Sequence, residues 1–144
     1  MAPRVSIVTP FAFPSPRGNA VTVERVARGL ADRGVDVRVW DLSAVPEAAV
    51  EERARDFAPA LVHAFHAYRV GPLALRLARR ADIPVVVTMT GTDANLDLVD
   101  PERSAVVRRV LERAAAVTVF DPSIGARLAR ALPGIESRIV EMCS

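Results

Sequence analysis

Short apolar runs of strand length alternate along this sequence with longer segments whose apolar residues recur every three or four positions. The first pattern is typical of strands buried on both faces, and the second of amphipathic helices. Strands that alternate with helices form parallel sheets with right-handed crossovers. The sequence therefore predicts an α/β fold, a doubly wound parallel sheet of about six strands with helices on both faces. The predicted strands occupy residues 4–9, 35–41, 61–65, 85–89, 116–120 and 138–142.

The helices are predicted from apolar residues at helical spacing. Gly34 is placed to end the first helix, because glycine readily adopts the left-handed backbone that follows a helix. Between the fourth strand and the fourth helix the residues are polar, and they predict a turn. The predicted helices occupy residues 19–33, 47–57, 70–81, 101–114 and 123–132.

A chain of 144 residues suits a single domain, and no repeat or linker divides it. With 51% hydrophobic and 25% charged residues, it has the composition of a folded soluble protein. No apolar stretch approaches the roughly 20 residues of a membrane-spanning helix, and the amino terminus carries no cleavable signal, so we expect a cytoplasmic protein. The single cysteine, Cys143, cannot form a disulfide within the chain.

The basic residues are all arginine, 19 in number, yet the net charge is only +2. This balance is too weak to predict nucleic-acid binding. The arginines are densest at the pairs 79–80 and 108–109. We interpret both pairs mainly as solvated helix faces, in preference to a patch for phosphate or anionic lipid.

Open parallel sheets bind their ligands beyond the carboxyl ends of the strands, so the residues after each strand are the first candidates for a site. Polar side chains follow the first, third, fourth and fifth predicted strands, and we expect these four loops to meet at one rim of the sheet. The candidate binding residues are Gly18, Asn19, His66, Tyr68, Arg69, Thr90, Gly91, Thr92, Asp93 and Asp121.

The loop after the first strand ends at Gly18 and Asn19, where a helix begins. Free backbone N–H groups and the helix dipole favour an anion there, and a glycine lets a phosphate or sugar approach closely. The alternative is that Gly18 only makes a turn and Asn19 only caps the helix. A G-x-G-x-x-G fingerprint is missing after the first strand, which argues against a dinucleotide-dependent reductase.

The run from Thr90 to Asp93 follows the apolar fourth strand and combines two hydroxyls, a glycine and a carboxylate. Such groups suit a hydroxyl-rich ligand, because a carboxylate can accept hydrogen bonds from two hydroxyls at once. The alternative is a turn that only caps the next segment.

The two histidines, His63 and His66, lie three residues apart across the end of the third strand and make a poor metal pair. His63 is expected in the core, whereas His66 either supports the rim or contacts a substrate. Arg69 could bind phosphate, but together with Tyr68 it also suits an exposed helix start. Asp121 precedes proline and is equally suited to beginning a helix. We predict no metal or cofactor.

Four segments, in this order, resemble the N-terminal domain of the retaining glycosyltransferases of family four, which have the two-domain GT-B fold. The segments are RVSIVTPFAFPSPRGNAVTVERVARGLADRGVDVRVW, LVHAFHAYRVGPLALRLA, IPVVVTMTGTD and ERAAAVTVFDPSIGARL. The resemblance covers essentially the whole chain. It implies that Gly18 approaches the transferred sugar and phosphate and that His66 belongs to the acceptor side. Many members carry a histidine at the position of Thr90, and a threonine cannot act there as an acid or base near neutral pH.

The resemblance implies that the chain, residues 1–144, is the acceptor-side domain of a glycosyltransferase of hexosyltransferase type. Such an enzyme moves a sugar from a nucleotide diphosphate sugar to a hydroxylated acceptor with retention of configuration. Its donor-binding residues would lie in a C-terminal domain absent from this chain, so we expect the chain alone to be inactive. The resemblance also allows peripheral contact with the inner membrane. The alternative is a stand-alone flavodoxin-like binding or interaction module without catalysis.

Overall fold

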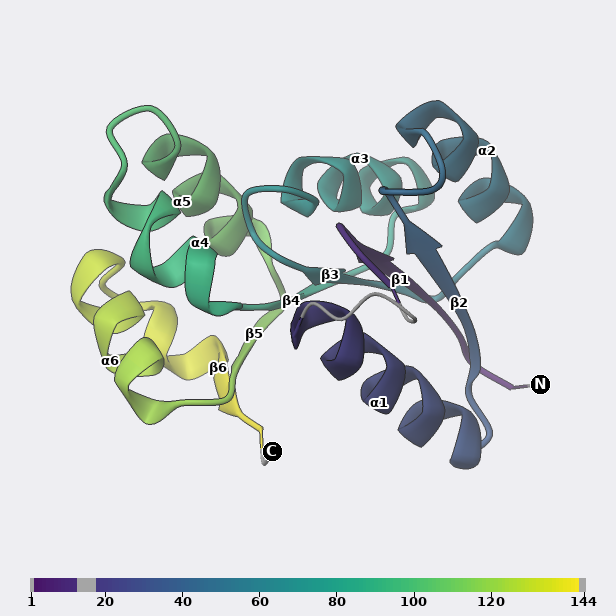
Figure 1. Ribbon diagram of the computed structural model, residues 1–144, viewed down its shortest axis with the longest axis horizontal. Coiled ribbons are helices and arrows are strands. Elements are labelled where there is room, and N and C mark those ends of the chain that lie inside the picture. Colours follow the sequence, from purple (N-terminus) through teal and green to yellow (C-terminus); the bar gives the residue numbers. More distant parts are fainter. Residues whose placement is uncertain (1, 13–17, 143–144) are drawn as a thin grey trace.

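The computed structural model describes residues 2–12 and 18–142. The strands among them form a single six-stranded sheet (Figure 1). Each pair of neighbouring strands is parallel, and their order is β2-β1-β3-β4-β5-β6. The predicted parallel α/β sheet is therefore confirmed. The strands are β1 Arg4–Thr9, β2 Asp36–Asp41, β3 Leu61–Phe65, β4 Val85–Thr88, β5 Ala116–Val119 and β6 Ile139–Glu141.

Helices cover both faces of the sheet, as predicted (Figure 1). The helix α1 packs Val23 against Ile7 and Phe65 on one face. Buried residues of α2, α3, α5 and α6 form a larger core with Val62 and Val87 on the other face. The helices are α1 Gly18–Asp32, α2 Glu47–Phe57, α3 Gly71–Ala81, α4 Gly91–Asn95, α5 Ser104–Arg113 and α6 Pro122–Ala131, with the 3₁₀ turns η1 Asp97–Val99 and η2 Ile135–Arg138.

Two glycines occupy positions where a side chain would be unfavourable. Gly34 has a φ of 84° after α1, which confirms that it ends the first helix. Gly71 begins α3 where that helix crosses α5, and a Cβ atom added to Gly71 would lie 2.7 Å from a methyl carbon of Val110. The approach of α3 to α5 therefore depends on a residue without a side chain.

The main error of the sequence prediction lies between β4 and α5. The predicted polar turn contains α4 and η1, and α5 begins at Ser104 instead of residue 101. The carboxylate of Asp100 explains the later start, because its Oδ1 accepts hydrogen bonds from the backbone N–H groups of Glu102 and Arg103, at 2.8 and 2.9 Å. This arrangement holds residues 101–103 in a turn before the helix. Near the end of the described chain, the turn η2 was not predicted. Because it extends to Arg138, β6 begins at Ile139 instead of residue 138.

Other predicted boundaries agree with the structure to within one or two residues, as expected for helix and strand ends. Cys143 lies outside the described residues, and so does the middle part of the glycine-containing loop, residues 13–17. Among residues 2–12 and 18–142, no helix is both long and apolar enough to cross a bilayer.

Candidate functional site

Two adjoining hollows lie at the carboxyl ends of the strands and together form what we call the rim groove. They have volumes of about 400 and about 350 Å³ and share Asn19, Thr90 and Gly91. The loop after β3 supplies further lining to the larger hollow. The rim groove therefore joins segments from three predicted loops. The candidate residues that line it are Asn19, His66, Arg69, Thr90, Gly91 and Thr92.

Asn19 lies in the first turn of α1 and ties that helix to the sheet. Its side-chain Nδ2 donates to Thr9 Oγ1 at 3.3 Å and to the Phe65 carbonyl at 3.4 Å. These contacts join α1 to the ends of β1 and β3. Asn19 therefore positions the wall of the groove in addition to lining it. Gly18 begins α1.

His66 is held in an unusual conformation just beyond the end of β3. Its φ of 117° lies where residues other than glycine are strained, and its side chain is 5% exposed. The Arg69 backbone N–H donates to His66 Nδ1 at 3.0 Å, which places the ring proton on Nε2. That nitrogen lies 3.5 Å from the buried Oδ2 of Asp97. Burial lowers the pKa of His66 to about 4, although Asp97 opposes this shift, so the ring is neutral near pH 7.

Asp93 lies beneath the groove, with its side chain turned away from it. The residue is completely buried, and its Oδ2 accepts a hydrogen bond from the Ala67 backbone N–H at 2.8 Å. Thr90 Oγ1 donates to Asp93 Oδ1 at 3.3 Å. Burial raises the pKa of Asp93 to about 7, against the opposing effect of these hydrogen bonds. Asp93 thus joins the loop after β3 to the start of α4, while Gly91 and Thr92 remain exposed at the groove.

The remaining candidate residues separate into one that lines the groove and two that do not. Arg69 is exposed at the groove, with its guanidinium carbon 5.7 Å from the centroid of the Phe11 ring. Tyr68 is half-buried, and its ring packs beneath the Arg103 guanidinium at 4.9 Å. Asp121 caps α6 by accepting the Ser123 backbone N–H at 2.9 Å, so its alternative role as a helix start is confirmed.

An ion pair behind His66, between a buried carboxylate and a half-exposed guanidinium, was not predicted from the sequence. Asp97 Oδ1 accepts a hydrogen bond from Arg103 Nη1 at 3.1 Å, and the side chain of Asp97 is only 2% exposed. Asp97 lies within the segment predicted as a turn and Arg103 lies at the start of the predicted helix 101–114, so no periodic pattern indicated that they are in contact. Phe120, which lines the smaller hollow and is 36% exposed, directly precedes the proposed Asp121. Its place after an apolar strand was the available signal.

His63 is a core residue, as predicted. Its ring stacks on Phe65 with centroids 4.4 Å apart, and burial lowers its pKa to about 4. His63 Nε2 and Thr88 Oγ1 are 2.6 Å apart, and Thr88 Oγ1 lies 2.6 Å from Thr118 Oγ1. A polar chain therefore crosses β3, β4 and β5 within the sheet. Within the described part of the chain, no three His, Cys, Asp or Glu residues are grouped to hold a metal ion.

Comparison with known proteins gives a family match over most of the sequence. A family model described as a glycosyl transferase 4-like domain matches residues 40–141. This match includes β3, β4 and β5 and the loops that follow them. No curated protein gives a significant match to the sequence.

Solved structures resemble the whole described fold. The Anabaena protein Alr3699/HepE, solved in complex with UDP-glucose, aligns with 97% of this chain at 14% identity and a TM-score of 0.66. LpCGTa, solved in complex with UDP, aligns with 100% of this chain at 12% identity and a TM-score of 0.57. At such low identities these similarities show the fold alone. This chain spans 43% of the length of the Anabaena protein and 53% of that of LpCGTa.

Proposed function

Because this chain belongs to the glycosyl transferase 4-like domain family, we propose that it forms the acceptor-binding half of a glycosyltransferase. The enzyme would move a hexose from a nucleotide diphosphate sugar to a hydroxylated acceptor. The observation that supports this most directly is the rim groove, because six candidate residues line it at the carboxyl ends of the strands. The UDP-glucose bound to Alr3699/HepE makes a UDP-sugar the first donor to test.

The groove offers hydrogen-bonding groups suited to a sugar. Thr92 presents a hydroxyl that can both donate and accept, while the Thr90 hydroxyl donates to Asp93 and can still accept, and Arg69 adds a guanidinium. Asp93 acts indirectly in this proposal, since its carboxyl group faces Ala67 instead of the groove. It would hold Thr90 in place, while the acceptor hydroxyls contact the threonines.

Retention of configuration is the stereochemical outcome that we propose. An inverting displacement needs a general base beside the acceptor hydroxyl. His66 is a poor base, because its Nδ1 already accepts the Arg69 N–H and its pKa is lowered to about 4. Thr90 cannot take that role near neutral pH, and Asp93 is buried. The lack of a poised base among these three residues supports retention.

We further propose that a second, C-terminal domain supplies the donor site. The departing nucleotide diphosphate develops negative charge that cationic groups must stabilise. Among the described residues lining the rim groove, Arg69 is the sole cation. The short span of this chain relative to Alr3699/HepE supports the same arrangement. Chain 1–144 alone should therefore bind acceptors without transferring sugar.

The test compares chain 1–144 with the product of its complete open reading frame, using UDP-glucose and a panel of sugar acceptors. UDP release and NMR of the anomeric proton report transfer and configuration. We expect the longer protein to transfer the sugar with retained configuration and chain 1–144 to transfer none. Turnover by chain 1–144 alone would contradict the two-domain proposal, an inverted product would contradict retention, and no transfer with any nucleotide sugar would overturn the proposed function.

A substitution within the groove tests the acceptor site itself. Thr90→Val removes a hydroxyl at nearly constant volume, and we expect the acceptor KM to rise by about tenfold because one hydrogen bond is lost. The control is Ser137→Ala, which removes an exposed hydroxyl from η2 outside the groove. Melting temperatures of both variants check the fold. An unchanged acceptor KM in Thr90→Val would remove Thr90 from the acceptor site.

A further inference from the structure

A second groove lies between α3 and α5, at the opposite end of the sheet from the rim groove. It has a volume of about 450 Å³ and includes Pro84 and Ala115, which precede β4 and β5. No aspartate or glutamate lines it among the described residues. We call it the arginine groove, because four arginines line it: Arg76 and Arg79 from α3, and Arg109 and Arg113 from α5.

The two arginine pairs noted in the sequence do not act as uniform solvated faces. Arg80 pairs with Glu51 at 3.2 Å, and Arg108 Nη1 donates to the Ala131 carbonyl at 2.6 Å. Their neighbours, Arg79 and Arg109, line the arginine groove instead. Each pair therefore has one member used in a structural contact and one at the groove.

Three of the four guanidinium groups are available to a ligand. Arg76 is held by Glu47 and Glu51, each at 3.2 Å. Arg79, Arg109 and Arg113 are exposed and have no ion pair or side-chain hydrogen bond with any described residue. A basic residue in the last turn of a helix complements the helix dipole, but two helices presenting such residues to one groove also concentrate positive charge there.

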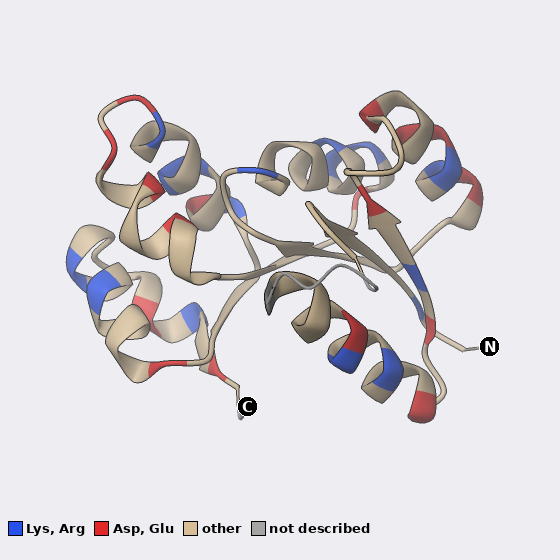
Figure 2. Cartoon of the chain, in the orientation of Figure 1, with Lys and Arg blue, Asp and Glu red and all other residues tan. Residues whose placement is uncertain are grey.

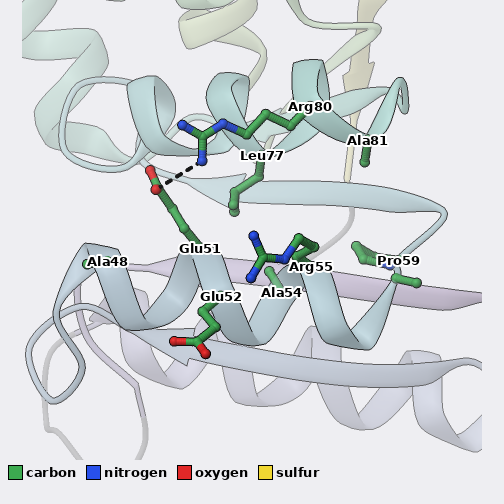
Figure 3. A pocket seen from close by; sticks show the side chains of 10 residues that line it. Ala48, Glu51, Glu52, Ala54, Arg55, Pro59, Leu77, Arg80 and Ala81 are labelled. Atoms are coloured by element: carbon green, nitrogen blue, oxygen red, sulfur yellow. Dashed lines mark hydrogen bonds and ion pairs between the residues drawn. The ribbon is translucent and has the colours of Figure 1, made fainter.

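The neighbouring groove between α2 and α3 shows the opposite balance. It has a similar volume of about 420 Å³, and its lining includes Glu51 and Glu52 together with Arg55 and Arg80 (Figure 3). Figure 3 shows the Glu51–Arg80 pair within it. Charges in that groove cancel, whereas the arginine groove carries cations alone. Figure 2 shows the basic segments of α3 and α5, the two helices that border the arginine groove.

Guanidinium groups form paired hydrogen bonds with phosphate oxygens, and the apolar residues Leu75 and Ile83 beside them reduce competition from water. We propose that the arginine groove binds a phosphate group through Arg79, Arg109 and Arg113. The phosphate belongs either to a soluble phosphate compound or to a lipid headgroup. This site is separate from the rim groove, so its test does not depend on glycosyl transfer.

The test uses the double variant Arg109→Gln/Arg113→Gln, which removes two charges at exposed helical positions. Its matched control is Arg25→Gln/Arg53→Gln, which removes two exposed arginines from α1 and α2 outside the groove. Titration with pyrophosphate probes a soluble ligand. Sedimentation with phosphatidylcholine vesicles, with and without phosphatidylglycerol, probes a headgroup. Circular dichroism checks that both variants fold.

Wild-type protein and the control should bind one of these two probes with similar affinity, and the groove variant about 30-fold more weakly. Pyrophosphate binding identifies a soluble phosphate ligand, while binding only to phosphatidylglycerol vesicles identifies a headgroup. Equal weakening in both double variants, or no wild-type binding to either probe, overturns the proposal. If the groove variant fails to fold, Arg79→Gln on α3 provides the same test. Unchanged binding of the probe by that variant would overturn the proposal.

Discussion

The individual residues of the rim divide into those that face the groove and those that support it from below. Their positions could be predicted, because a residue that follows a parallel strand must lie at the carboxyl edge of the sheet. Their side-chain directions could not. Asp93 turns inward because the Ala67 backbone N–H lies behind it, and this contact joins segments 26 residues apart. Spacing along the sequence carries no signal for such a pairing.

The raised pKa of Asp93 predicts a pH-dependent stability. Its pKa rises from 3.8 to about 7 in the folded protein, so its contribution is complete below about pH 4 and is lost as the pH rises towards 7. The Asp93→Asn variant has no carboxyl group to titrate at this position, so this loss of stability is absent from it. The free energy of unfolding of wild type, relative to the variant, should therefore fall by a few kcal/mol, up to about 4, from pH 4 to 7.

Urea unfolding of both proteins across this pH range measures the difference. His63 and His66 have lowered pKa values and act in the opposite direction, with stability lost as the pH falls towards 4. Both histidines are present in wild type and variant, so their effect largely cancels in the comparison. A difference that does not change with pH would show that the pKa of Asp93 is not raised in the folded protein.

At the scale of helices and strands, the sequence predicted every element long enough to display a period. The apolar spacing located α2 to the residue, and Gly34 marked the end of α1. The elements α4 and η1 were missed because five and three residues are too short to show one. Their stability comes partly from tertiary contacts, such as the hydrogen bond from the Ala67 backbone N–H to Asp93 of α4, which no local pattern reveals.

The crossing of α3 and α5 gives a prediction at this scale. Gly71→Ala should destabilise the protein by about 1–3 kcal/mol, because the new methyl group would meet Val110 at 2.7 Å. Gly29→Ala is the matched control, since no atom lies within 4 Å of the Cβ position within α1. That change should stabilise the protein by about 0.5–1 kcal/mol. Thermal unfolding measures both, and a neutral Gly71→Ala would mean that α5 shifts away without cost.

Over the whole molecule, the alternation of strands and helices along the sequence predicted the parallel sheet, but it did not determine the strand order β2-β1-β3-β4-β5-β6, which the structure supplies. The relative exposure of the strands adds detail to this picture. The central strands β1, β3 and β4 are mostly buried, whereas β6 lies at an edge and only Ile139 of its three residues is partly covered. The sheet should therefore be most stable at its centre.

Hydrogen exchange should reveal this gradient. Amides of β3 and β4 should exchange roughly a hundredfold or more slowly than those of β6, because opening the centre requires global unfolding while the edge opens locally. Exchange measured by NMR or mass spectrometry resolves the strands separately. Equal protection of β6 and β3 would show that the edge strand does not open independently.

The polar chain formed by His63, Thr88 and Thr118 has a consequence for how the strands find their places. Apart from their threonines, β4 and β5 consist of valine and alanine, so a shifted pairing of these two strands would cost little in hydrophobic contact. Sliding one strand by a single residue would turn its polar member to the opposite face and break the 2.6 Å contacts. These three side chains therefore favour the native register of β3, β4 and β5, because a sheet with shifted strands would lose their contacts.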